Sequence, residues 1–348
     1  LPVAFIGCYL AALLGLVWAW GGTVLAWVTA WPLRYILAVA KVLSKLPGAV
    51  LFTGNRMVVW WLVLVYVMFG AAWLISRRRK ARYWIPAACS VLALCAVLTV
   101  NAVQLQRTST VTALDVSQGQ SIVFSSGRAC AVVDCGGRST VEDPGDLAAR
   151  KLLAQGHRSL DLLVLTHPHD DHINGVLRLM HWLPVRTLVI PAAADTTKAP
   201  LSDILALAVE NHTTVVRVDA ERTVTAGSIS VHLYPEPCAG QEDGSMIVLT
   251  SVGDYDTLVP GDVDSAAEVK FLSDCVYPSV ELLLVGHHGS KKSTSDAWLD
   301  AIAPDDAIIS VGYNNYGHPT SDTLERLQAH HIPIYRTDQM GDITVHLS

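Results

Sequence analysis

The chain has 348 residues, and its 31 acidic and 25 basic side chains give a formal charge of −6. Residues 1–103 contain no Asp or Glu and eight of the ten Trp, whereas residues 104–348 contain all 31 acidic residues and all 13 His. With only 16 Lys and Arg, the second part has a formal charge of −15 and no basic stripe. Because DNA affinity normally rests on Lys and Arg that neutralise phosphates, this composition predicts weak binding of DNA by charge alone. The asymmetry excludes one uniform soluble domain and indicates a membrane segment followed by a soluble domain.

Three apolar stretches in the first part are long enough to span about 30 Å of hydrocarbon. They cover roughly Val3–Trp31, Ala49–Ile75 and Tyr83–Val103. The first is too long for a signal peptide and has no basic start. Between the first two, Leu33–Leu46 has the pattern of an amphipathic helix at the membrane interface. We expect residues 1–103 to form about three transmembrane helices and, since the chain does not begin with Met, to be a fragment of a larger polytopic protein.

The basic residues between the spans predict the orientation. Arg77–Arg82 is the densest basic cluster of the chain and lies between the second and third spans, so the positive-inside rule places it in the cytoplasm. The third span then leads back across the membrane, and residues 104–348 are expected outside the cytoplasm. The loop between the first two spans is mildly basic and weighs against this orientation.

Short apolar strands alternate with helical patterns through residues 104–348, which predicts layered α/β packing in one domain. The expected strands are Thr110–Val116, Ser121–Phe124, Ala129–Asp134, Leu160–Leu165, Thr187–Ile190, Val215–Val218, Ser228–Leu233, Met246–Thr250, Thr257–Val259, Glu281–Val285, Ala307–Val311 and one near Ile343. The expected helices are Asp146–Gln155, one from Ile173 onward, Leu201–Glu210, Ala266–Leu272, Ser295–Ala301 and Ser321–Ala329.

Cysteine spacing argues against a cysteine metal site, because the soluble part has no CxxC pair. A disulfide such as Cys130–Cys135 would suit an extracytoplasmic domain, and buried free thiols are the favoured alternative.

The run Thr-His-Pro-His-Asp-Asp-His directly follows the predicted strand Leu160–Leu165 and places His167, His169, Asp171 and His172 within six residues. Imidazoles and carboxylates suit zinc, manganese and related divalent ions. The first two histidines can point at one metal, and the Asp and His that follow can turn toward a second. A polar turn rich in His by chance is the weaker interpretation.

Further candidate residues also come just after predicted strands. Asp262 follows Gly261 at the end of one strand, where it could bridge two metals or simply belong to a turn. His287 and His288 end another strand, and adjacent residues of an extended chain point oppositely, so only one of them is an easy metal ligand. His318 follows a third strand and could be a general acid or a further ligand.

The order of these motifs resembles the metallo-β-lactamase superfamily. The finer resemblance is to the corresponding domain of the ComEC family, the DNA-uptake channels of natural competence, and it covers essentially all of residues 104–348. Its motifs appear here as Asp115-Val-Ser-Gln-Gly-Gln120, Asp134-Cys-Gly-Gly137, His287 to Ser295, Ile309–Pro319 and Arg336–Gly341. Leu46-Pro-Gly-Ala49, before a span, also fits the family's membrane region.

Some positions depart from the family pattern. Ser117 and Gln120 replace a Gly and an Asp of the first motif, and His169 stands where many family members have Asp. The superfamily's middle His ligand has no counterpart near Glu242–Ser245, where Asp243 or water could fill the gap.

The resemblance implies an αββα sandwich that binds two divalent ions, zinc or manganese, at the sheet edges. One ion would take His167 and His169, the second would take Asp171, His172 and His287, and Asp262 would lie between them. The catalytic candidates are Asp171, His318, His288 and Lys291, and the substrate-binding candidates are Ser290, Ser293, Ser295 and His318.

The implied substrate is a phosphodiester. The implied function is DNA internalisation at the bacterial inner membrane, with one strand of incoming DNA degraded outside the cytoplasm. The implied partners are single-stranded DNA and other components of the uptake machinery. The resemblance leaves open whether the chain forms a homo-oligomer. Two alternatives compete with the nuclease: hydrolysis of a small or cell-envelope phosphoester, and a structural gate in which metals only order loops.

Overall fold

The computed structural model describes residues 2–44, 56–76, 83–105, 107–138, 142–235 and 245–347. By contacts the chain divides into two units, Leu1–Phe52 and Thr53–Ser348.

Two helices that pack against each other, α1 (Pro2–Val17) and α2 (Ala19–Leu43), occupy the first unit. Gly15 and Gly22 meet where the helices cross, and a Cβ atom on Gly22 would lie 2.4 Å from the Cα of Gly15. The expected single span Val3–Trp31 is therefore wrong, because extended backbone at Trp18 breaks it. Neither Gly nor Pro stands at this break to signal it. The expected separate helix Leu33–Leu46 is also wrong, since α2 continues through Pro32 to Leu43.

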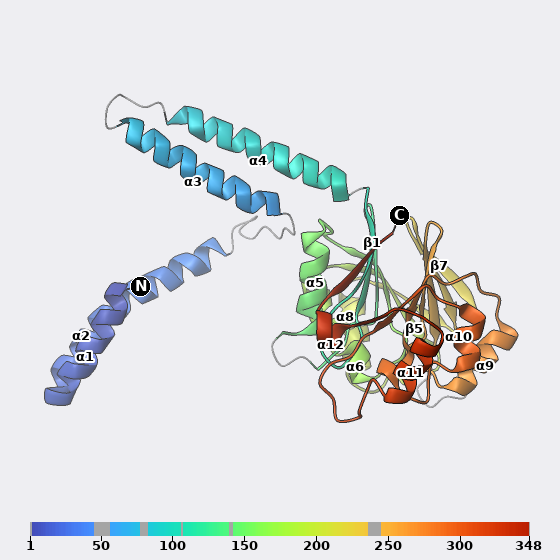
Figure 1. Cartoon of the computed structure of the whole chain (residues 1–348). Helices are drawn as coiled ribbons and strands as arrows, with labels where there is room; N and C mark the ends of the chain where they lie inside the picture. The colour runs from blue at the N-terminus through green and yellow to red at the C-terminus, as the bar shows by residue number, and fades with distance from the viewer. Residues whose placement is uncertain are drawn as a thin grey trace. The chain divides into compact units, whose positions relative to one another are not determined.

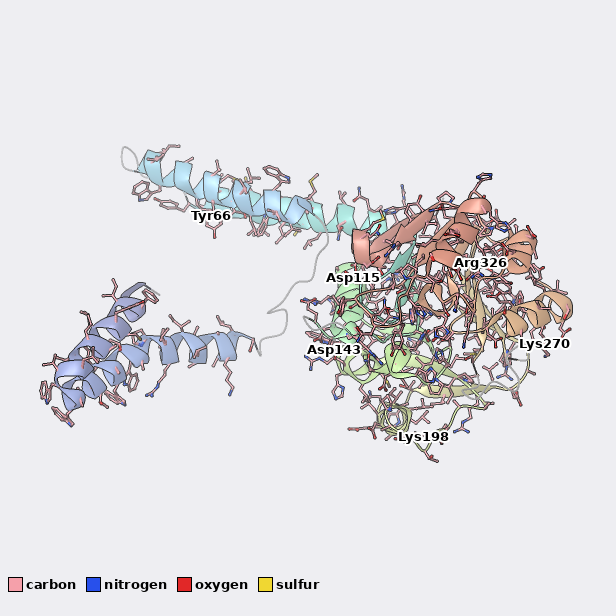
Figure 2. All side chains as sticks on the ribbon, turned by 60° about the horizontal axis from the view of Figure 1, so that its bottom comes forward. Tyr66, Asp115, Asp143, Lys198, Lys270 and Arg326 are labelled. Carbon is pink, nitrogen blue, oxygen red and sulfur yellow. The ribbon has the colours of Figure 1, made fainter. Side chains whose placement is uncertain are left out.

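The next two helices, α3 (Arg56–Ser76) and α4 (Trp84–Leu105), also pack against each other. The indole of Trp61 donates a hydrogen bond of 2.8 Å to the backbone oxygen of Ser90. Apolar side chains project from these helices, and Tyr66 is among the exposed ones (Figure 2). In the described ranges three helices are long and apolar enough to cross a membrane: Ala19–Leu43, Met57–Ile75 and Trp84–Leu105. The basic cluster Arg77–Arg82 lies entirely outside the described residues, which resume at Tyr83.

Two seven-stranded sheets follow, covered by helices on their outer faces (Figure 1). The first has the order β14-β1-β2-β3-β4-β5-β6 and the second β13-β12-β11-β10-β9-β8-β7. The strands of the first sheet are β1 (Ser109–Ala113), β2 (Ile122–Ser126), β3 (Ala129–Val133), β4 (Leu160–Val164), β5 (Val185–Pro191), β6 (Thr214–Val218) and β14 (Ile343–Leu347). Those of the second are β7 (Arg222–Ala226), β8 (Ile229–Tyr234), β9 (Ile247–Val252), β10 (Tyr255–Val259), β11 (Leu282–Leu284), β12 (Asp306–Ile309) and β13 (Ile334–Arg336).

The helices divide between the two outer faces. Against the first sheet pack α5 (Pro144–Ala154), α7 (Val176–Trp182) and α8 (Leu201–Glu210). Against the second pack α9 (Ser265–Asp274), α10 (Asp296–Ile302) and α11 (Ser321–Ala329). The short α6 (Asp170–Ile173), a 3₁₀ turn at Gly286–Gly289 and α12 (Thr337–Met340) lie in connections.

Alternating side chains build the layers of this sandwich. On β11, Leu282 and Leu284 face the core between the sheets, whereas Leu283 faces the core beneath α9 and α10. On β3, Val133 faces the inner core, and Val132 faces the core beneath α5. Fully burying one such side chain contributes about 1.5–3 kcal/mol. The predicted αββα fold is confirmed, and its cores hold the two sheets in a rigid relation.

Two cysteines of the domain lie in this buried framework as free thiols, Cys130 on β3 and Cys135 just after it. The pair is therefore not joined by the disulfide that the sequence left open. Burial raises the pKa of Cys130 to about 12. Cys238 lies outside the described residues.

Candidate metal centre

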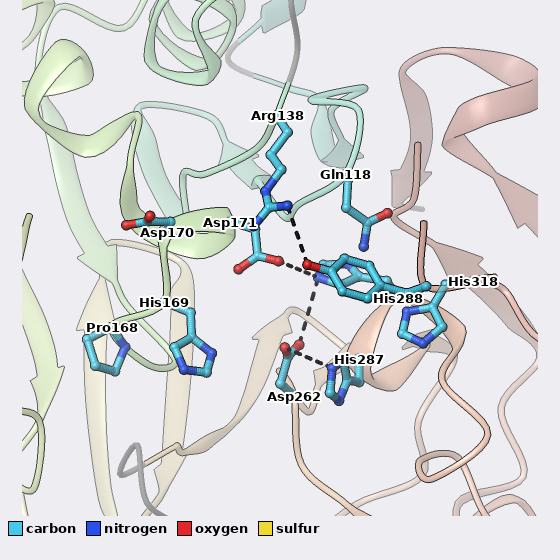
Figure 3. Close-up of a pocket in the computed structure, with 11 residues that line it drawn as sticks. Gln118, Arg138, Pro168, His169, Asp170, Asp171, Asp262, His287, His288 and His318 are labelled. Atoms are coloured by element: carbon cyan, nitrogen blue, oxygen red, sulfur yellow. Dashed lines mark hydrogen bonds and ion pairs between the residues drawn. The ribbon is translucent and has the colours of Figure 1, made fainter. Parts of the chain in front are cut away.

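The candidate residues gather at one edge of the sandwich because the strands that carry them end there. Strands β3 to β6 run parallel in the first sheet, and β10 to β13 run parallel in the second. The carboxyl end of β4 leads to His167, that of β10 to Asp262, and that of β11 to His288. Side chains about 100 residues apart in the sequence thus face one space (Figure 3).

Three buried histidines each have one ring nitrogen occupied by a partner. The Nδ1 of His167 lies 3.0 Å from the Thr166 hydroxyl, that of His172 lies 2.7 Å from Asp134 Oδ2, and that of His288 lies 2.9 Å from the backbone oxygen of Ser310. Such partners fix the orientation of a metal-binding imidazole. The Nε2 atom of each ring remains for another role.

These three Nε2 atoms are buried and have no hydrogen-bond partner among the described residues, and the same holds for Oδ1 of Asp262. Nε2 of His172 lies 3.2 Å from Asp262 Oδ1, and Nε2 of His167 lies 3.6 Å from Asp262 Oδ2. Buried polar atoms without partners cost free energy, and cations bound between these residues would satisfy them. The donor set therefore fits a divalent metal ion.

A second group adjoins the first. Asp171, His172 and His288 offer ligand atoms within 4.8 Å of one another, as do His167, His172 and Asp262. Nε2 of His288 lies 3.7 Å from Asp171 Oδ2. The two groups share His172, whose Nε2 can bind one ion only, so two neighbouring ions would divide the other ligands between them.

The structure differs from expectation at the paired histidines. His288 is buried in the second group, whereas the expected ligand His287 is half-buried, its Nε2 3.6 Å from Asp262 Oδ2. The expectation assumed an extended chain, but both residues have left-handed backbone, with φ of 51° and 54°. This turn lets both rings approach the site.

His169 is the other expected ligand outside both groups. It is exposed, its ring centroid lies 4.7 Å from that of His167, and it lines the pocket. The structure thus brings together His167, Asp171, His172, Asp262 and His288, with His169 and His287 at the rim.

Asp134 supports the site, a role that sequence reasoning missed. Its Oδ1 accepts a hydrogen bond of 2.7 Å from the Thr166 backbone N–H. Its Oδ2 lies 2.7 Å from both His172 Nδ1 and the Thr166 hydroxyl, and 2.8 Å from the amide of Gln120. The available signal was its position directly after buried β3, at the same edge as the ligands.

Opposite charges shape the ionisation of the centre. Burial disfavours charge on His172, but the Asp262 and Asp134 carboxylates outweigh it and raise its pKa well above the ordinary value. Burial likewise opposes ionisation of Asp262 and Asp171, yet the neighbouring histidines hold both pKa values low. Burial lowers the pKa of His167, so this ring favours the neutral form that binds metal.

A pocket of ≈ 490 Å³ opens over the centre. It is lined by Gln118, Arg138, Pro168, His169, Asp170, Asp171, Asp262, His287, His288, Tyr316 and His318. Three of the lining residues were not site candidates from the sequence: Gln118 and Tyr316, which lie inside the motifs Asp115–Gln120 and Ile309–Pro319, and Arg138, which directly follows Gly137. No ligand-type pattern marked them.

Comparison with known proteins decides the family. Residues 114–313, more than half of the chain, match the family model described as the metallo-beta-lactamase superfamily. The chain belongs to this superfamily.

The superfamily domain is shared with competence proteins. The chain is 30% identical over 251 residues to "ComE operon protein 3" of Bacillus subtilis (strain 168), which covers 66% of this chain and 32% of that protein. It is 30% identical over 243 residues to "Competence protein ComA" of Neisseria gonorrhoeae, covering 66% of this chain and 31% of that protein. "Recombination protein 2" of Haemophilus influenzae is 26% identical over 235 residues, covering 67% and 28%. The matched part thus spans about a third of these relatives, and the predicted resemblance to the ComEC family is confirmed.

Departures from the superfamily pattern have local reasons. Ser117 stands in left-handed backbone with φ of 62°, where the family's Gly would be unstrained. The Gln120 amide donates to the Asp134 carboxylate, a bond that an ionised Asp at this position could not make. Asp243 lies outside the described residues.

The expected substrate-binding serines are engaged elsewhere in this superfamily domain. The Ser293 hydroxyl donates to the backbone oxygen of Val263, and Ser295 caps α10 by accepting from Trp298 N–H. Ser290 is buried and accepts from Lys292 N–H. None of the three is among the residues that line the pocket, and neither is the exposed Lys291.

Proposed function

We propose that this chain acts in DNA internalisation during natural transformation and hydrolyses phosphodiester bonds of the strand that is not transported. Residues 1–103 would hold it in the membrane, and residues 104–348 would carry the hydrolase site. The convergence of three unpartnered Nε2 atoms and the Asp262 carboxylate beneath an open pocket is the observation that supports this function most strongly. The competence relatives support DNA as the substrate.

Two divalent ions, zinc or manganese, are proposed as cofactors. His167 and Asp262 would hold one, Asp171 and His288 would hold the other, and Nε2 of His172 would bind one of the two. His169 and His287, at the rim, could complete either set. Ions bound there would lower the pKa of a bound water molecule and stabilise negative charge on the phosphate that is attacked.

Residues of the chain would position the reacting groups. Asp134, through its bond to His172, keeps one shared ligand in a fixed orientation. His318 lines the pocket, and its buried Nδ1 has no hydrogen-bond partner in the part of the chain that the structure describes. Burial and the nearby His287 lower the pKa of His318, so its neutral ring can accept a proton and return it to a leaving oxygen.

The location follows from the membrane helices and the basic cluster. Three helices suited to a bilayer and the cluster Arg77–Arg82 support an inner-membrane protein whose hydrolase domain lies outside the cytoplasm. Protease added outside spheroplasts should then cut the domain, and full protection would contradict the orientation. Single-stranded DNA, other uptake components and a second copy of the chain are the proposed partners.

The function is tested with the full chain in detergent, supplied with Mn²⁺ or Zn²⁺ and labelled single-stranded DNA. We expect cleavage by the wild type and a loss of at least about 100-fold in rate for Asp171→Ala, because a ligand carboxylate is removed. Asp254→Ala is the matched control: this carboxylate is exposed, outside both ligand groups and outside the pocket lining, so its replacement should leave the rate near that of the wild type.

Two measurements separate the alternatives. A wild type that binds metal, cleaves small chromogenic phosphodiesters and leaves DNA intact would favour a small-substrate hydrolase. A wild type that binds metal and cleaves neither substrate would favour the alternative of a structural gate in which the metals only order loops. Metal content and thermal melting of each variant show whether a loss of activity reflects unfolding.

A further inference from the structure

A second pocket adjoins the metal centre. It has a volume of ≈ 350 Å³ and shares Gln118, Arg138 and Tyr316 with the larger pocket, to which it adds Tyr313, Asn314 and Asn315. A ligand over the metal centre could therefore extend into it without leaving the surface. We call it the annex.

Asn314 holds the loop that forms one side of the annex. Its Oδ1 accepts hydrogen bonds of 3.0 Å from the backbone N–H groups of Tyr316 and His318. Its Nδ2 donates hydrogen bonds of 2.8 Å to the backbone oxygens of Gly312 and His318. With both ends of the amide used, the loop is held in one conformation before any ligand arrives.

This loop displays two tyrosines to solvent. Tyr313 is 90% exposed and Tyr316 is 61% exposed. Tyr316 lies between the annex and the metal centre, with its ring centroid 5.9 Å from that of His318. Exposed aromatic rings beside a polar pocket offer flat apolar faces that favour stacking on another ring.

Arg138 supplies a positive charge between the two pockets. Its backbone N–H donates to the backbone oxygen of Gln118 at 2.9 Å, and its guanidinium lies 3.4 Å from the Tyr316 hydroxyl. Among the residues that line either pocket, in the part of the chain that the structure describes, it is the one Lys or Arg. In a domain of −15 charge, a cation beside the site points to an anionic ligand.

We propose that Arg138, Tyr313 and Tyr316 form a subsite for single-stranded nucleic acid, in which the tyrosines stack on bases next to the scissile phosphodiester and Arg138 contacts a flanking phosphate. Aromatic rings beside a cation are how sequence-tolerant single-strand binding is achieved. The faces of bases in a duplex are already stacked, so the subsite selects single strands. The inference rests on the proposed function, whose substrate it makes specific.

The test measures binding, so that it does not depend on cleavage. The full chain in detergent with Mn²⁺ is titrated against a fluorescent single strand of about 12 nucleotides with phosphorothioate linkages. We expect Tyr313→Ala and Tyr316→Ala each to weaken binding about tenfold, and Tyr313→Phe to bind like the wild type because it keeps the ring. Met340→Ala is the control, since this exposed residue lines neither pocket.

A second oligonucleotide with abasic sugars isolates the stacking. The loss of affinity caused by Tyr313→Ala should disappear with this oligonucleotide. Arg138→Ala should weaken the binding of both oligonucleotides, and Arg138→Lys should restore part of the affinity. A wild type that does not bind the strand, or variants that bind it like the wild type, would overturn the subsite. If the variants lose affinity as expected but the wild type cleaves nothing, the subsite stands and the proposed hydrolysis fails.

Discussion

Asp134 shows how one buried residue can control the metal centre without touching a metal. Its carboxylate accepts from His172, from both donors of Thr166 and from Gln120. We predict that Asp134→Asn lowers metal affinity by about 10- to 100-fold, because an amide places N–H groups against donors that need acceptors. Competition with a metal-binding dye measures the change.

The backbone at this position favours the choice of Asn. Asp134 has φ of 58°, a left-handed conformation that Asn tolerates well, so the substitution adds little strain. Asp338→Asn, at an exposed carboxylate paired with Arg336, is the matched control and should leave affinity unchanged. Equal affinities in both variants would show that Asp134 does not orient His172.

For single residues, the sequence predicted which residues belong near the metal centre better than it predicted their roles there. The spacing of His167, Asp171 and His172 after an apolar strand was enough to find them. The choice of His288 over His287 depends on left-handed backbone that no local pattern signals. Arg138 and Tyr316 enter the pocket only because loops from different strands meet.

His157 connects two elements and makes their contact sensitive to pH. It lies between α5 and β4, and its Nε2 is 2.8 Å from the Ser125 hydroxyl on β2, out of solvent. Burial lowers its pKa, so the folded protein takes up a proton less readily than the unfolded chain. A depressed His pKa gives stability that is present above the unfolded value of about 6.5 and lost as the pH falls through the folded value.

We therefore predict that the melting temperature of the wild type falls below about pH 6.5 more steeply than that of His157→Gln. Circular dichroism melts of the full chain in detergent, taken across this range, measure the difference. His346→Gln, exposed on the edge strand β14, should keep the wild-type slope. The prediction fails if His157→Gln leaves the dependence of melting temperature on pH unchanged.

Strands whose side chains alternate between two cores were predictable, whereas two of the four edge strands were missed. β11 and β3 read as apolar runs because both faces are covered. The missed strands, β7 and β13, end the second sheet and carry mostly exposed or half-buried side chains. An edge strand needs one neighbour only, so its sequence has weak hydrophobic periodicity.

Over the whole molecule, charge limits how a nucleic acid can be held. Residues 104–348 have a formal charge of −15, and Arg138 is the one Lys or Arg that the described part places in the lining of the two pockets. Affinity for a strand should then come from bound divalent ions and stacking on tyrosines, with little from counterion release.

Salt dependence checks this expectation. Each phosphate neutralised on a single strand contributes a slope of about −0.7 to the logarithm of affinity against the logarithm of salt concentration. We predict a slope between about −0.7 and about −1.4, which corresponds to one or two contacts, and a reduction of its magnitude by about 0.7 in Arg138→Ala. Removal of the metal by chelation should weaken binding more than an increase in salt concentration does. A slope near about −4 would require a basic surface, and the domain would then bind DNA by a face other than its metal centre.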